Sequence, residues 1–234
     1  MRRILSSIRE SLASLGWGNG LLAIAARTVD KLSRGRWRIY KYLFVAQPVP
    51  ATSLAPPLNE SRTRIYRATP GDGIIATFPR PPEIIAQRFR NGAVCLVAER
   101  AQSLAGFIWI QRQSYCEDEV RCDYLLDPAA ELAWDFDAYV APEHRMSRAF
   151  AQLWDAANRH LRAEGCRYTL SRISAFNAAS LAAHRRLDIV RVATGTFLVA
   201  GPWQLALFSC KPWAHFGTGA AHRPRVVFHP PAAR

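Results

Sequence analysis

The segment Glu131–Val140, ELAWDFDAYV, has a strand-like pattern and carries Asp135 and Asp137 two positions apart in its interior. Side chains alternate between the two faces of a strand, so Asp135, Asp137 and Tyr139 are expected on one face and the apolar residues on the other. Burying two acids on a central strand is costly unless they are paired or serve a purpose. Asp135 or Asp137 could therefore position an amine or accept its proton, directly or through water. Pairing with Arg172 or another strand arginine is the alternative.

A second candidate group lies in the segment NAASLAAHRRL, residues 177–187, which has the pattern of a helix. Asn177 precedes the first turn and is expected to cap it. His184 is a candidate proton donor, because an imidazole titrates near neutral pH. The alternative is an ordinary helical histidine on the surface or in the core, which is the commoner case.

The segment Val140–Phe150, VAPEHRMSRAF, leads a turn into a helix predicted for Ser147–Glu164. The first turn of a helix has unpaired N–H groups and the positive end of the dipole, so anions bind there. Arg145 and Arg148 stand at or near this terminus, where cations are disfavoured by about 0.3–1 kcal/mol. A bound anion would relieve that conflict, and guanidinium groups match phosphate oxygens well. The alternative is that both arginines are solvated or paired with Glu143.

A mixed sheet is expected to position these segments, because strand and helix patterns alternate between residues 62 and 210. The predicted order is β-α-β-β-β-α-β-α-β-β. Hairpins in the first half favour an antiparallel part, and the strand–helix–strand crossover in the second half favours a parallel pair. The pattern predicts an α/β fold with a mixed sheet of about six or seven strands.

The formal net charge of the 234-residue chain is +13, and it is concentrated at the two ends. Residues 1–46 carry +7 and residues 211–234 carry +4, whereas residues 47–210 carry only +2. Basic ends favour attraction to anionic lipid, nucleic acid or an acidic partner, or serve solubility alone. Residues 47–61 are rich in Pro, Ser and Ala and are expected to be a linker, with a globular domain at 62–210 and a mobile tail at 211–234.

Residues 1–34 have the pattern of two short amphipathic helices separated by GWGNG, and residues 36–45 that of a strand. A basic amphipathic helix with aromatic residues can lie on a membrane surface, so residues 1–46 could provide peripheral membrane contact. The alternative is a helical hairpin packed on the main domain. No segment has the length of a spanning helix or the form of a secretory signal. Five cysteines without a CxxC pair argue against a metal site or a disulfide framework, and a cytoplasmic location is expected.

Two motifs, taken together, resemble the GCN5-related N-acetyltransferase (GNAT) superfamily. One is V-x-P-x-x-R at Val140, Pro142 and Arg145, which enters a long helix. The other is N-x-x-S-x-x-x-H-x-R-L, from Asn177 to Leu187, where the family usually has N-x-x-(A/S)-x-x-x-Y-x-K-x-G-F. The motifs lie one crossover unit apart, and the resemblance covers residues 62–208.

This resemblance implies a site for acyl-CoA. The pantetheine arm would pair with strand backbone near Tyr139 and Val140, and Asn177 and Ser180 would line the same channel. His184 stands where many relatives place a Tyr that protonates the departing CoA thiolate. The pyrophosphate would lie on backbone amides at the start of the long helix, those of Arg145, Met146, Ser147, Arg148 and Ala149.

The sequence departs from the family pattern in two places. Met146 and Arg148 stand where relatives have glycines, which let the ligand approach the backbone closely. Side chains do not remove the amides, but they can block access to them. Asp188 stands where relatives usually have Gly after the helix, and Asp tolerates the left-handed conformation better than most residues.

The resemblance implies an acyl-CoA-dependent N-acyltransferase, most simply an acetyltransferase, without a metal. It would move the acyl group of acetyl-CoA or another acyl-CoA to a small-molecule amine by direct attack, with strand amides polarising the carbonyl. The alternatives are a catalytically degenerate GNAT-fold binding protein, or a membrane-surface acyltransferase that uses a longer acyl donor. Nucleic-acid binding is not expected, because the core is nearly neutral and carries no known nucleic-acid motif. The sequence sets neither the acceptor nor the oligomeric state.

Overall fold

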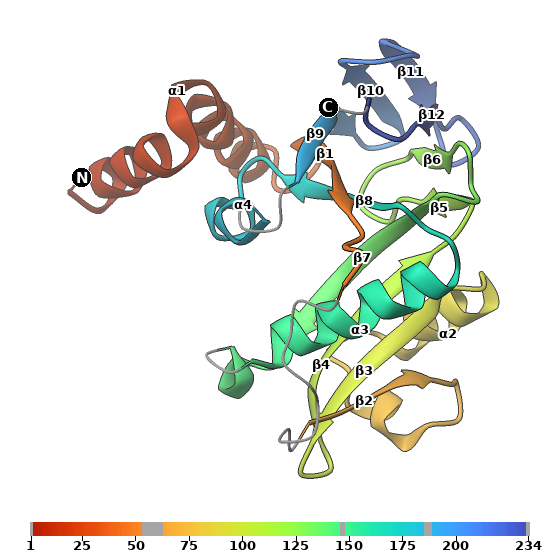
Figure 1. Ribbon diagram of the computed structural model, residues 1–234. Coiled ribbons are helices and arrows are strands. Elements are labelled where there is room, and N and C mark those ends of the chain that lie inside the picture. The colour runs from red at the N-terminus through yellow and green to blue at the C-terminus, as the bar shows by residue number, and fades with distance from the viewer. Residues whose placement is uncertain (1, 53–62, 146–147, 185–188, 233–234) are drawn as a thin grey trace. The chain divides into compact units, whose positions relative to one another are not determined.

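The computed structural model describes residues 2–52, 63–145, 148–184 and 189–232, and the chain divides into two compact units (Figure 1). Unit 1 comprises Met1–Gln47, Ser114–Leu125 and Leu170–Arg234. Unit 2 comprises Pro48–Gln113 and Leu126–Thr169. Each unit contains both strands and helices.

Unit 2 has four strands in the order β7-β4-β3-β2, and each neighbouring pair is antiparallel. Its elements are β2 (Thr63–Ala68), η2 (Gly73–Thr77), α2 (Pro82–Arg90), β3 (Val94–Arg100), β4 (Ser103–Gln111), β7 (Leu132–Val140), η3 (Pro142–His144) and α3 (Ala149–Ala163).

Helices cover both faces of these four strands. Leu153 of α3 belongs to the same buried cluster as Ile108 and Ile110 of β4. Ile85 of α2 lies in a second cluster with Trp109 of β4, on the opposite face. Because successive residues of a strand point to opposite faces, β4 is apolar along both sides. The helix predicted for Ser147–Glu164 is confirmed as α3, and Gly165, with a φ of 77°, follows its C-terminal end.

Unit 1 holds the remaining elements, of which β1 and β6 end in unit 2 and β8 begins in unit 2. They are α1 (Arg2–Leu32), β1 (Trp37–Pro48), β5 (Ser114–Cys116), β6 (Asp123–Leu126), β8 (Tyr168–Ser174), α4 (Ala178–His184), β9 (Val190–Ala200), β10 (Trp203–Phe208), β11 (Ala214–Thr218) and β12 (Arg225–Phe228).

The mixed α/β fold is confirmed, but the predicted strand number was too low. Within the described residues the main sheet has nine strands, five of which run in the order β11-β10-β9-β1-β8 and four of which are those of unit 2. A second sheet has three strands, in the order β12-β6-β5. The two additional strands of the main sheet, β1 and β11, lie outside residues 62–210, whereas the second sheet pairs β12 from the C-terminal segment with β6 and β5 from within that range. β1 pairs with β9 from Trp37↔Ala200 to Ala46↔Val190, and β11 pairs with β10.

The N-terminal helix α1 is broken at Gly16, where φ is 75° and ψ is 164°. The prediction of two helices is confirmed. The break falls at a glycine because glycine adopts a positive φ without a steric penalty. The separator is Gly16 alone, since Trp17 to Gly20 belong to the second helix. No helix in the described ranges combines the length and the apolar run that crossing a membrane requires.

Strand β7 contains a bulge that the alternation of its sequence did not predict. Phe107↔Tyr139 and Trp109↔Phe136 are successive pairs, so β7 has one extra residue relative to β4. Asp137 lies at this point with a φ of 48°. A bulge shifts the alternation, so the expectation that Asp135, Asp137 and Tyr139 share one face is wrong.

Candidate active site

Two arginines hold the carboxylate of Asp137 at the bulge of β7. The Arg80 Nε donates to Asp137 Oδ2 at 2.8 Å, and its Nη2 donates to Oδ1. The Arg88 Nη1 donates to Oδ2 at 2.5 Å. The Arg88 guanidinium also lies 5.4 Å from the centroid of the Trp109 ring and 5.1 Å from that of Phe136. The extra residue of β7 is therefore fixed on the α2 face of the sheet.

These contacts set the protonation of Asp137. Burial alone would raise the pKa of its carboxyl group, since only 12% of the side chain is exposed. Hydrogen bonds and charge from Arg80 and Arg88 outweigh burial, and the pKa lies below its usual value. Asp137 is therefore ionised near neutral pH and has a low affinity for a proton.

Asp135 lies on the face opposite to Asp137. It pairs with Ile110 of β4, which belongs to the cluster beneath α3, and its side chain accepts a hydrogen bond from the Thr169 hydroxyl. The residue is only 5% exposed. Asp135 and Asp137 thus occupy different environments, Asp135 beneath α3 and Asp137 between two arginines.

The loop after β7 presents the N-terminus of α3. Ala141 is buried and donates its N–H to Ala105 O at 3.0 Å, which ties the start of the loop to β4. Arg145 and Arg148 are both exposed, and neither has a carboxylate partner among the described residues. Arg148 is the N-cap and makes no capping hydrogen bond, and the first turn has no acid. This terminus therefore combines helix-dipole charge with two cationic side chains.

The remaining site candidates belong to α4 in unit 1. Asn177 Oδ1 accepts the Ser180 N–H at 3.0 Å, so the predicted cap is confirmed. Ser180 is partly exposed, and His184 is the last residue of α4. The side chain of His184 lies outside the described part of the structure, as do Met146, Ser147 and Asp188.

Arg172 of β8, expected as an alternative partner for the acids of β7, has other partners. Its Nε and Nη2 donate to Glu117 at 2.6 and 2.8 Å, and its Nη2 lies 2.8 Å from Glu119 Oε2. Its guanidinium lies 4.4 Å from the centroid of the Tyr42 ring, and the Tyr42 hydroxyl donates to Glu119. All residues of this cluster belong to unit 1. The arginines that contact Asp137 are instead Arg80 and Arg88 of unit 2.

Comparison with known proteins decides the family. The model of the Acetyltransferase (GNAT) family matches residues 60–188, which is more than half of the chain. This chain belongs to the GNAT acetyltransferase family. The match includes the β7 bulge, the N-terminus of α3 and all of α4. No curated protein sequence matches the chain.

Several solved structures are similar to this chain at low sequence identity. A tandem GNAT protein from the clavulanic acid biosynthesis pathway has a TM-score of 0.50 and 16% identity, over 70% of this chain and 55% of that one. A GNAT-family putative acetyltransferase from Novosphingobium aromaticivorans has a TM-score of 0.46 and 16% identity, over 78% and 66%. A GNAT acetyltransferase from Elizabethkingia anophelis, with acetyl-CoA bound, has a TM-score of 0.40 and 12% identity, over 54% and 75%. The chain spans 66% of the length of a matching structure of unknown function from Staphylococcus epidermidis, 57% of a Drosophila protein and 55% of the clavulanic acid pathway protein.

The structure of this GNAT chain brings some candidates together within one unit. Tyr139, Val140, Arg145, Arg148 and Ala149 follow the bulge in one continuous stretch of unit 2. Asn177, Ser180 and His184 form a separate set in unit 1.

Sequence reasoning missed the two arginines that anchor the bulge and the glycine opposite it. Arg80 and Arg88 precede β7 by about fifty residues, and no local pattern links them to Asp137. Gly106, an isolated glycine inside an apolar strand, was an available signal of close backbone approach.

We expect Gly106→Ala to destabilise the protein by about 1–3 kcal/mol, because a Cβ there would lie 2.5 Å from the Tyr139 carbonyl oxygen. Gly106 pairs with Val140, so relief of the clash would displace β7 just after the bulge. Urea unfolding measures the change. Gly73→Ala is the control, since a Cβ there meets nothing within 4 Å. Equal midpoints for the two variants would contradict the close approach.

Proposed function

We propose that this GNAT protein is an acyl-CoA-dependent N-acyltransferase, most simply an acetyltransferase, that acts on a small-molecule amine. The observation that carries the proposal is the uncapped N-terminus of α3, flanked by Arg145 and Arg148, directly after the bulged end of β7. The family match supports acyl transfer as the reaction class.

The α3 terminus fits a ligand that carries phosphate. Its N-cap residue, Arg148, makes no side-chain capping hydrogen bond, and the first turn has no acidic residue, so the positive end of the helix dipole favours an anion here. Arg145 and Arg148 would bind phosphate oxygens in place of the close backbone approach that glycines permit. Acetyl-CoA, when bound, supplies the acyl group as a thioester. We therefore propose that Arg145, Arg148 and the first-turn amides hold its pyrophosphate.

The bulge would serve the pantetheine arm. A bulge takes backbone groups out of the regular strand ladder and bends the strand. Tyr139 and Val140 follow directly after the extra residue, and Gly106 allows β4 to approach them closely. We propose that their backbone groups pair with the ligand.

The proposed proton chemistry rests on the sequence resemblance for His184 and on the contacts and burial of Asp137 and Asp135. His184 is proposed as the donor to the departing thiolate, in the place where relatives have a Tyr. Asp137, with its lowered pKa, is a weak base, and its contacts favour a positioning role for the bulge. Asp135 is buried beneath α3 and accepts a hydrogen bond from Thr169. We propose that it positions strand β7 and does not accept the proton of the amine.

Release of free thiol from acyl-CoA tests the activity. Acetyl-CoA and longer acyl-CoA donors are offered with panels of amines, and amine-dependent thiol release is expected for at least one pair. A preference for long acyl chains would favour the membrane-surface alternative. Binding of acetyl-CoA without thiol release for any amine would favour a catalytically degenerate binding protein.

We expect Arg148→Ala and Arg145→Ala each to raise the Kd of acetyl-CoA by about tenfold, because each removes a charge-assisted contact to phosphate. Arg159→Ala is the matched control on α3, since Arg159 pairs with Asp155 away from the N-terminus. Titration calorimetry gives the three constants. Equal Kd values for Arg148→Ala and Arg159→Ala would place the pyrophosphate elsewhere.

A further inference from the structure

One face of the unit 1 sheet is apolar and exposed. We define the outer face as the side of β1, β9, β10 and β11 that carries Trp37, Ile39, Leu198, Trp203, Leu205, Leu207 and Phe216. On the opposite side of the same strands, Tyr42, Phe197 and Ala206 are buried, and the ring centroids of Tyr42 and Phe197 lie 5.6 Å apart. A sheet that is buried on one side ordinarily presents polar residues on the other.

The strand register places these residues in continuous rows. Ile39 pairs with Leu198, Leu198 with Leu205, and Leu205 with Phe216, so one apolar row crosses four strands. The neighbouring row runs from Trp37 through Ala200 to Trp203. Directly opposed residues share a face of the sheet. Trp37 and Ile39 lie two positions apart on β1, so the two rows are neighbours on the same face.

The large side chains of the outer face are open to solvent. Phe216 is 65% exposed, Trp203 57%, Trp37 51% and Leu207 49%. Single exposed apolar residues are ordinary, but a contiguous group of this size is typical of an interaction site. Tryptophan is also enriched at membrane–water interfaces, where its ring contacts lipid and its polar N–H contacts water.

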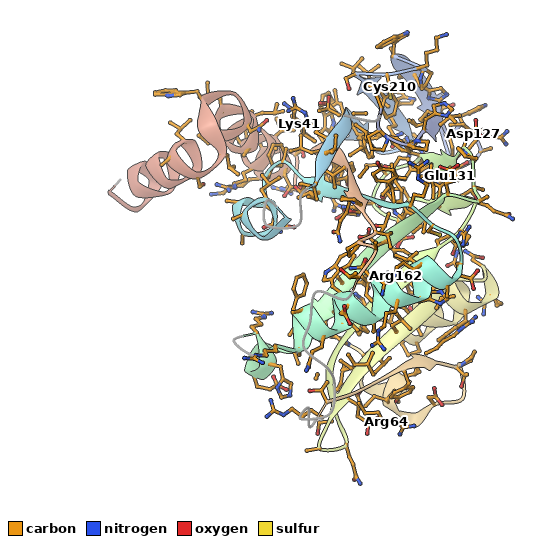
Figure 2. The ribbon with its side chains drawn as sticks, viewed as in Figure 1. Lys41, Arg64, Asp127, Glu131, Arg162 and Cys210 are labelled. Carbon is orange, nitrogen blue, oxygen red and sulfur yellow. The ribbon has the colours of Figure 1, made fainter. Side chains whose placement is uncertain are left out.

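The charge around the outer face selects an anionic partner. Residues 31–47 contain five Lys or Arg and no acid, and residues 189–232 contain four and no acid. Lys41 of β1, labelled in Figure 2, pairs with Thr196 of β9. This pair lies on the outer face, in the row next to that of Ile39 and Leu198. Within the described residues of unit 1, Arg36, Lys41 and Lys211 have no carboxylate partner. Two copies of such a surface would repel each other, whereas an anionic surface attracts it.

The C-terminal end of α1 adjoins the outer face through one tight turn. The Trp37 N–H donates to Ser33 Oγ at 2.9 Å, and the Gly35 N–H donates to Asp30 O at 2.8 Å. Leu32, just before this turn, is 80% exposed. The exposed apolar surface thus extends from Trp37 to the end of a helix that carries exposed Arg27 and Lys31.

We propose that the outer face docks on a bilayer that contains anionic phospholipid. The tryptophan, phenylalanine and leucine side chains enter the boundary between headgroups and acyl chains, and the surrounding Lys and Arg side chains bind lipid phosphates and carboxylates. Binding of this kind grows with the buried apolar area and with attraction to anionic lipid. The proposal concerns location and stands apart from the acyltransferase reaction.

Vesicle flotation of the full chain tests the proposal. We expect the protein to float with phosphatidylcholine–phosphatidylserine vesicles, not with phosphatidylcholine alone, and to be released by high salt. The double variant W203S/F216S should lower the bound fraction at least about tenfold, because it removes two exposed aromatic anchors. Val227→Ser, an exposed apolar residue of β12 in the other sheet, should bind as the wild type does.

Circular dichroism confirms that each variant is folded, and Leu207→Ser replaces the double variant if that one is not. Failure of the wild type to float with anionic vesicles would overturn the proposal, as would equal flotation of W203S/F216S. Sedimentation velocity tests the other possible occupant of the outer face, a second copy of the chain. A dimer that W203S/F216S dissociates, without vesicle binding by the wild type, would assign the outer face to a second copy of the chain.

Discussion

Replacing His184 with Phe is expected to lower the rate of amine-dependent thiol release by about 100-fold or more and to leave the Kd of acetyl-CoA unchanged. A positioned general acid contributes about 10²–10⁴ in rate, and Phe keeps a planar ring without a proton to donate. Because the imidazole acts on the departing thiolate, its loss affects turnover and not ground-state binding. Steady-state thiol release and titration calorimetry on the same sample give both quantities.

Two further variants separate proton donation from packing. His184→Tyr should retain activity within about tenfold of the wild type, because a phenol can donate a proton from the place where relatives have a Tyr. His229→Phe, near the C-terminal end of the described chain, should have no effect. Unchanged turnover in His184→Phe, or equal losses in His184→Phe and His184→Tyr, would remove the proton-donor role from this residue.

The second large effect is expected at the bulge, where Asp137→Asn should lower the free energy of unfolding by about 2–3 kcal/mol at pH 7. The variant leaves the guanidinium groups of Arg80 and Arg88 partly buried without a carboxylate. Removing one partner of a buried ion pair is costly because the other charge remains desolvated. Urea unfolding monitored by tryptophan fluorescence measures the difference.

The pH dependence of this effect follows from the lowered pKa of Asp137. A carboxyl group whose pKa is lower in the folded state contributes stability that is fully present above its unfolded pKa of about 4. That contribution is lost as pH falls through the folded pKa. The stability difference between wild type and Asp137→Asn should therefore be constant from pH 5 upward and narrow below about pH 4.

Glu131→Gln is the control for the Asp137 series. Glu131 pairs with Arg167 at the surface, with exposed side-chain fractions of 37% and 64%, and such pairs contribute about 0–1 kcal/mol (Figure 2). A stability loss for Asp137→Asn no larger than that for Glu131→Gln would show that the two arginines do not depend on this carboxylate.

The elements that local pattern specifies were predictable from the sequence. Helix α2 begins with Pro82 at its first position, and Gly165 follows the end of α3. For each helix, the apolar periodicity and one end signal therefore indicate the same segment. The Asn177 cap was also predictable, because it depends on a contact to a residue three positions ahead. Interactions within one helical turn are encoded locally.

The bulge and the extra strands depend on partners far away in the chain. Alternation in β7 is regular in sequence, and only pairing with β4 reveals the extra residue at Asp137. β1 obtains its partner from β9, about 150 residues later, so the sequence could not show that this segment enters the main sheet. Arg80 and Arg88 reach Asp137 from the region around α2, and no spacing rule connects them.

Titration of acetyl-CoA into the folded full-length chain is the most direct test of the central claim. We expect saturable binding at one site, with a Kd below one millimolar that rises in Arg148→Ala and not in Arg159→Ala. Absence of binding heat up to millimolar acetyl-CoA, in a sample whose circular dichroism shows it to be folded, would contradict the assignment of the α3 terminus as a pyrophosphate site and of the chain as an acyl-CoA-dependent enzyme.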